Sequence, residues 1–114
     1  MTHKTLAHTY FDQLVDTFLA QYTQTSTGRM LSAPALKMNA RVAAFYSPNQ
    51  EMVFRLGNSF DPTAIRNVNI HVFRPLKNLA PLKDWFVVPF SAKEHWPQLT
   101  EQALLFTLDT TQAA

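Results

Sequence analysis

The N-terminal part of the chain shows the spacing of apolar side chains that is typical of a helix. Leu6, Tyr10, Leu14 and Phe18 recur at every fourth position, and polar residues fall between them. This spacing places the apolar groups along one face of an amphipathic helix. The segment TQTSTG should end the helix, because Thr and Ser compete with helical backbone hydrogen bonds and Gly28 suits a helix exit.

The next segment, RMLSAPALKM, changes to a period of two and predicts one strand. Pro34 weakens this strand and suggests an edge position or a bulge. Asn39-Ala40 is the predicted turn that follows. The segments RVAAFYS (41–47) and EMVFRL (51–56) flank SPNQ, and they predict an antiparallel hairpin.

Beyond the hairpin the pattern weakens. Asp61 and Pro62 suit the N-cap and the first residue of a helix, so one or two helical turns are expected through Arg66. IHVF (70–73) predicts a short strand, and a loop framed by prolines is expected at 75–81.

The C-terminal segment returns to helical spacing, with Trp96, Leu99, Ala103 and Phe106 at intervals of three and four residues. Because Pro97 does not fit inside a helix, we expect a separate helical turn and then a helix that starts at Pro97. The whole pattern predicts one α+β domain over residues 1–114. It has two layers, with N- and C-terminal amphipathic helices bracketing a mostly antiparallel sheet of about four to five strands.

The run WFVVP (85–89) has no polar face, although a strand with one face in water should alternate apolar and polar residues. If both helices pack on one face of the sheet, either the set containing Trp85 and Val87 or the alternate set faces water and marks an interface. A second copy of the chain or the loop 57–81 could cover it, and a symmetric homodimer is slightly favoured. The candidate oligomer interface consists of Phe86, Val88 and Phe90.

The composition is that of a packed globular domain, with 46% apolar and 16% charged residues in a chain of 114. No apolar run approaches the ~20 residues needed to cross a bilayer, and no signal peptide is recognisable, so we expect a cytoplasmic protein that does not bind membranes. The absence of Cys excludes disulfides, thiolate nucleophiles and Cys-ligated zinc. Trp85 and Trp96 should both be buried, in the same core.

Charge is unevenly distributed along the chain. Residues 29–83 hold eight Lys and Arg against two acidic residues, a net charge of +6, whereas the flanking segments are negative. A basic sheet side could contact nucleic acid or an acidic partner, or it could simply solvate an open sheet face. No predicted helix carries clustered Lys or Arg for a major groove. The candidate contact residues are Arg41, Arg55, Arg74, Lys77 and Lys83.

Catalytic and metal-binding patterns are weak. The four histidines, at 3, 8, 71 and 95, include no pair four residues apart, so a preformed metal site is not expected. The chain has only two glycines, too few for a phosphate-binding loop, and no serine lies in a GxSxG context. We therefore expect neither a cofactor nor enzymatic activity.

Several motifs together resemble a known family. GRMLSAPALKMNARVAAFY, EMVFRL and FRPLKNLAPLKDWFVVP, followed by a helix containing Trp, are similar to the N-terminal domain of the TfoX/Sxy competence regulators. The resemblance covers about residues 6–108 and departs at Leu31-Ser32, at Asn39-Ala40 and at Phe73-Arg74-Pro75. It implies an α+β fold and a non-enzymatic regulatory or interaction module with an unidentified protein partner. Direct but weak nucleic-acid binding through the basic sheet side is the second hypothesis.

Overall fold

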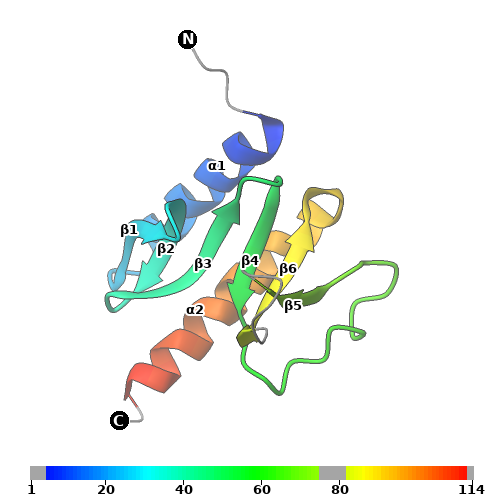
Figure 1. Ribbon diagram of the computed structural model, residues 1–114. Helices are drawn as coiled ribbons and strands as arrows, with labels where there is room; N and C mark the ends of the chain where they lie inside the picture. The colour runs from blue at the N-terminus through cyan, green and yellow to red at the C-terminus, as the bar shows by residue number, and fades with distance from the viewer. Residues whose placement is uncertain (1–4, 75–81, 113–114) are drawn as a thin grey trace.

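The computed structural model describes residues 5–74 and 82–112 of the chain. Its elements in chain order are α1 (Leu6–Gln21), β1 (Thr25–Met30), β2 (Ala33–Met38), β3 (Arg41–Ser47), β4 (Glu51–Arg55), β5 (His71–Phe73), β6 (Leu82–Pro89), the short 3-10 helix η1 (Phe90–His95) and α2 (Trp96–Gln112). The strands form one antiparallel sheet in the order β1-β2-β3-β4-β6-β5. Figure 1 views this sheet from one face, with both helices behind it.

The predicted α+β class is therefore confirmed, with six strands where four to five were expected. Both amphipathic helices form, and the C-terminal one starts at Trp96 after the separate turn η1. The helical turns expected from Asp61 to Arg66 are absent, and the chain makes turns and bends there. The Asp61 carboxylate instead accepts hydrogen bonds from the amide and the hydroxyl of Thr63.

The single strand expected for RMLSAPALKM is in fact a hairpin. TSTGRM forms β1, and the chain reverses at Leu31 and Ser32, which have positive φ values of 52° and 70°. Positive φ at both central residues is the conformation that suits a two-residue hairpin, usually with Asn or Gly there. Pro34 lies opposite Arg29 of β1 and outside the part of β2 that pairs with β3.

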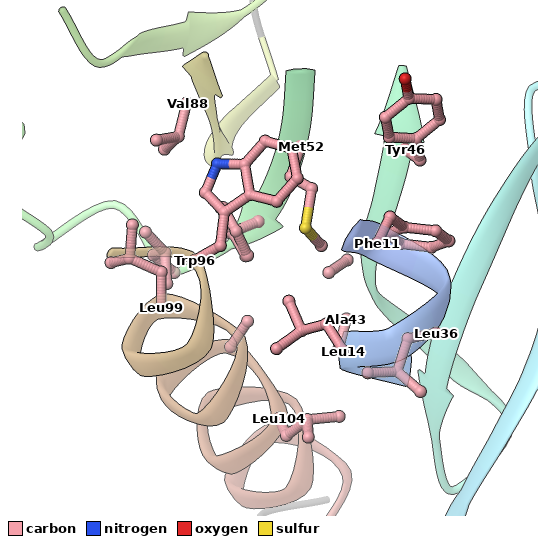
Figure 2. Packing of buried hydrophobic residues seen from close by; sticks show 14 of the residues in the cluster. Phe11, Leu14, Leu36, Ala43, Tyr46, Met52, Val88, Trp96, Leu99 and Leu104 are labelled. Carbon is pink, nitrogen blue, oxygen red and sulfur yellow. The ribbon is translucent and has the colours of Figure 1, made fainter. Parts of the chain in front are cut away.

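The main core lies between the sheet and the two helices. Leu36, Ala44, Phe54 and Phe86 form one row across four neighbouring strands, and their side chains point to the helices. The helices contribute buried residues such as Phe11, Leu14, Leu99 and Leu104. Figure 2 shows the Trp96 indole between α2 and the strands that carry Met52 and Val88.

The interface prediction for WFVVP is wrong in its choice of residues. Phe86 and Val88 are 3% and 0% exposed because the helical layer covers them, so they cannot form an exposed row. Phe90 is half-buried, with its ring centroid 5.6 Å from that of Trp96. Trp85 is also half-buried, but it packs on the opposite face of the sheet, so the two tryptophans do not share one core.

The opposite face of the sheet, which we call the far face, carries a second cluster. Ala33, Ala35, Phe45, Val53 and Val87 are all buried there. A bulge in β3 contributes to this arrangement: Leu36 pairs with Ala44 and Lys37 with Val42, so Ala43 is the extra residue. As a result Ala43 and Ala44 both pack on the helix side, and Val42 packs on the far face.

Part of the far face is covered by the chain leaving β5. Strands β3 and β5 are separated by β4 and β6, so the two should lie about 14 Å apart at the usual strand spacing. Yet the ring centroids of Phe45 and Phe73 are only 5.3 Å apart. The end of β5 must therefore bend over the far face, and the pairing between β5 and β6 is irregular at Val72/Phe73, where this bend occurs. In Figure 1 the arrow of β5 points back across β6.

Candidate functional site

The sequence-predicted cations do not all gather on one surface. Arg41 begins β3, Arg55 ends β4 and Lys83 lies near the start of β6, so the antiparallel register brings these three to one end of the sheet. Arg41 and Lys83 are exposed. Arg74 follows Phe73, the partner of Leu82 in β6, but its side chain lines a hollow together with Ser47 and Glu51. Lys77 falls outside the described residues.

Arg55 is engaged within the protein. Its guanidinium lies 5.4 Å from the ring centroid of Phe106, and its Nη1 donates a hydrogen bond of 3.5 Å to Thr110 Oγ1. Both partners belong to the last turns of α2, where a cation is favoured by the helix dipole. Arg55 therefore helps to hold α2 on the sheet, and less of its charge is available to a ligand.

A first candidate site is the interhelical groove, a hollow of about 730 Å³ between α1 and α2. Leu14, Phe18 and Leu105 supply its apolar lining, and Gln21, Gln98, Glu101 and Gln102 are among its polar lining residues. Leu105 is 43% exposed, which makes it one of the few large apolar side chains in the described chain that face water.

The groove exists because the helices are held together mainly at their N-terminal ends. There the Tyr10 hydroxyl donates a hydrogen bond of 3.1 Å to the Lys93 carbonyl, and the Tyr10 ring lies 5.7 Å from the ring of Trp96. Further along, each helix packs on the sheet and makes few direct contacts with the other. The space between them is left as an open channel floored by apolar side chains.

The acidic residues are the only Asp, Glu, Lys or Arg side chains within α1 and α2 themselves. α1 contains Asp12 and Asp16, α2 contains Glu101 and Asp109, and neither helix contains Lys or Arg. The interhelical groove therefore lies in a negatively charged surface, whereas the sequence had suggested the positively charged sheet segment as the contact surface.

A second candidate site is the far-face hollow, a smaller cavity of about 180 Å³. Its floor contains Val53 and Val87, and its polar lining includes Ser47, Glu51, His71 and Arg74. The β3-β4 hairpin supplies Ser47 and Glu51, and the segment that bends over the far face supplies Arg74. Sequence reasoning missed this group because the bend at Val72/Phe73, which brings the two halves together, leaves no recognisable signal in the sequence.

The far-face hollow offers binding groups more than catalytic ones. The hydroxyl of Ser47, which is a buried residue, accepts a hydrogen bond of 3.3 Å from the Asn49 amide, and no hydrogen bond joins it to His71 among the described contacts. Activation of a serine nucleophile requires a base within hydrogen-bond reach. Within residues 5–74 and 82–112 there is also no group of three or more His, Cys, Asp or Glu that could hold a metal ion.

Among the described residues, one carboxylate has a clearly shifted pKa, and it lies away from both hollows. The hydroxyl and the amide of Thr63 donate to the Asp61 carboxylate and lower its pKa below the ordinary value of 3.8. Asp61 is fully exposed in the loop after β4, so this pair shapes a turn.

Comparisons with protein-family models, curated proteins and solved structures found no match to this chain. The resemblance to the TfoX/Sxy N-terminal domain therefore stays a prediction. Among the helices of the described residues, none has both the length and the apolar character required to cross a membrane.

Proposed function

We propose that this chain is a non-enzymatic interaction module whose interhelical groove binds a short, basic, amphipathic helix of a protein partner. The observation that carries the proposal is Leu105, an exposed apolar side chain in a groove whose surrounding helices carry only negative charge. A regulatory role, as the family resemblance implies, and the expected cytoplasmic location are both compatible with such binding.

The dimensions of the groove favour a helix of about two turns. Its lining runs from Leu14 to Gln21 on α1 and from Pro97 to Leu105 on α2. At 1.5 Å per residue, both stretches are about 10–12 Å long. An amphipathic helix that docks in such a groove places two or three apolar anchors at i, i+3 or i+4, and i+7.

Charge and polarity define the rest of the partner. Glu101 at the groove would attract Lys or Arg flanking the apolar anchors, and the glutamines can exchange hydrogen bonds with polar groups of the docked helix. Complete burial of a leucine is worth about 1.5–3 kcal/mol, so covering the exposed part of Leu105 should contribute about 1 kcal/mol.

The test uses a labelled synthetic helix with Leu at i, i+3, i+4 and i+7 and Lys at the other positions, titrated by fluorescence anisotropy. A peptide with Glu in place of Lys is the charge control. We expect the basic peptide to bind, and Leu105→Glu and Glu101→Lys each to weaken binding about tenfold or more. The matched controls are Leu6→Glu, at an exposed leucine outside the groove lining, and Asp16→Lys, at an acidic residue outside it.

Equal binding of the two peptides, or unchanged binding by the Leu105→Glu variant, would refute the proposed groove. A homodimer is a further outcome, since a second copy could also dock there. Sedimentation of the unlabelled protein at micromolar concentration distinguishes this case, because Leu105→Glu would then convert a dimer to a monomer.

The second candidate function is nucleic-acid binding at the end of the sheet that carries Arg41, Arg55 and Lys83. Because Arg55 is already engaged with α2, we expect this binding to be weak and non-specific. Its affinity should fall with roughly the 0.9 power of salt concentration for each phosphate neutralised. A tight, sequence-selective complex at physiological salt would reverse the order of the two candidates.

A further inference from the structure

The far-face hollow brings opposite charges to one small cavity. Glu51 is half-buried on β4, whereas His71 and Arg74 are exposed at the two ends of β5. Between these lining groups the floor is apolar, because Val53 and Val87 are almost completely buried there. The cavity thus combines a carboxylate, a guanidinium, an imidazole and a hydroxyl around an apolar base.

These charges are not used to hold the protein together. Among the described contacts, Glu51 makes no ion pair with His71 or Arg74, and none of the three side chains takes part in a hydrogen bond. The carboxylate oxygens of Glu51 lie more than 4.0 Å from the side-chain nitrogens of His71 and Arg74. The carboxylate and the guanidinium therefore line the same cavity but remain separated by a gap.

A gap of this kind suits a ligand that carries both charges. We infer that the far-face hollow binds a small zwitterion of the α-amino acid class, with its ammonium group on Glu51 and its carboxylate on Arg74. Ser47 can donate its hydroxyl proton to the ligand carboxylate, because its oxygen already accepts from the Asn49 amide. The site lies on the opposite side of the sheet from the interhelical groove, so it is independent of the proposed function.

The size of the cavity limits the ligand. A volume of about 180 Å³ corresponds to about six water molecules at 30 Å³ each, which favours a ligand with similarly few non-hydrogen atoms. The floor of Val53 and Val87 favours a short apolar side chain. L-alanine meets both conditions, and a ligand this small should bind with a dissociation constant on the order of 1 mM.

The experiment titrates 15N-labelled protein with L-alanine and follows backbone amide shifts by NMR. N-acetyl-L-alanine lacks the ammonium group and L-alaninamide lacks the carboxylate, so these two ligands separate a zwitterion site from a simple anion or cation site. Glu51→Gln and Arg74→Gln remove one charge each without changing side-chain size greatly. Glu94→Gln and Lys83→Gln are the matched controls, at an exposed carboxylate and an exposed cation outside the hollow.

We expect L-alanine to shift the amides around Ser47, Glu51 and His71 in the wild type and in both control variants. Loss of one charge-assisted contact should weaken binding about tenfold, both in Glu51→Gln and Arg74→Gln and with the two blocked ligands. Because all four positions are exposed or half-buried, each variant should keep the dispersed spectrum of a folded chain. The inference is overturned if L-alanine causes no saturable shift, if either blocked ligand binds as well as L-alanine, or if Glu51→Gln binds like the wild type.

Discussion

Two threonines of α2 offer a direct test of what a buried hydroxyl contributes to this fold. Thr100 and Thr107 are both 0% exposed. The hydroxyl of Thr100 donates a hydrogen bond of 2.7 Å to the Trp96 carbonyl, one turn earlier in the helix. The hydroxyl of Thr107 has no hydrogen-bond partner within the described part of the chain. The same substitution, threonine to valine, should therefore have opposite effects at the two positions.

The expected magnitudes follow from this difference. Valine has nearly the shape of threonine and a similar helix propensity, so neither variant opens a cavity or weakens the helix. At position 107 the substitution removes a polar group that was buried without a partner, whose desolvation costs about 1–3 kcal/mol. We expect Thr107→Val to raise the free energy of unfolding by at least about 1 kcal/mol. Thr100→Val loses a satisfied hydrogen bond and should lower it by about 1 kcal/mol.

Urea denaturation followed by circular dichroism at 222 nm measures both effects. The two midpoints should move in opposite directions with unchanged slopes, because the surface exposed on unfolding is the same. In thermal unfolding, each variant should shift the midpoint by about 4 °C. A Thr107→Val variant as unstable as Thr100→Val would show that the Thr107 hydroxyl is satisfied in solution, and the argument from its missing partner would fail.

Three further predictions concern the backbone and one carboxylate. Ala40 has φ +67° in a hairpin turn, so Ala40→Gly should raise the free energy of unfolding by about 1 kcal/mol in urea denaturation. Ala20→Gly, on the exposed face of α1, should lower it by about 0.5–1 kcal/mol. A change of the same sign in both variants would contradict the argument from backbone conformation. Gly57 has φ +88°, and an added Cβ would lie 2.6 Å from a ring carbon of Phe106. Gly57→Ala should therefore lower the free energy of unfolding by about 2–4 kcal/mol, and a loss below ~1 kcal/mol would contradict this prediction. The lowered pKa of Asp61 means that its contribution to stability is present above pH 3.8 and is lost as the pH falls through the lower folded-state value. Asp61→Asn should therefore show a shallower loss of stability below pH 3.8 than the wild type, and identical acid profiles would count against the Asp61 turn.

The sequence by itself determined the elements whose stability is local. The four-residue repeat of α1 and the three- and four-residue intervals of α2 allow only one face of each helix to be buried. Both helices were predicted, but the buried face of α1 is centred on Phe11, Leu14 and Phe18, and Leu6 is 81% exposed. The β3-β4 hairpin was also predictable, because SPNQ contains residues that favour a reversal. The α+β class follows from these elements, since amphipathic helices and half-buried strands must cover one another.

The β1-β2 hairpin could not be found in this way. Leu31 and Ser32 occupy a turn conformation in which Asn and Gly are usual, so the residue types at these two positions did not indicate a turn. The hairpin forms nonetheless, because β1 pairs with β2 along its full length and β2 pairs with β3. The summed strand pairing outweighs a local cost of about 1–2 kcal/mol for each unfavourable residue.

Only the tertiary structure decided which surfaces are free. The pattern of WFVVP indicated that both faces of the strand are covered. Which segment packs on each face depends on contacts between residues far apart in the chain. The helical layer covers Phe86 and Val88, while Phe73 reaches Phe45 over two intervening strands. That bend also brings Arg74 to Glu51 and creates the far-face hollow. Periodicity records which side of an element is buried, whereas the partner that buries it is set by chain topology and long-range packing, which no local pattern encodes.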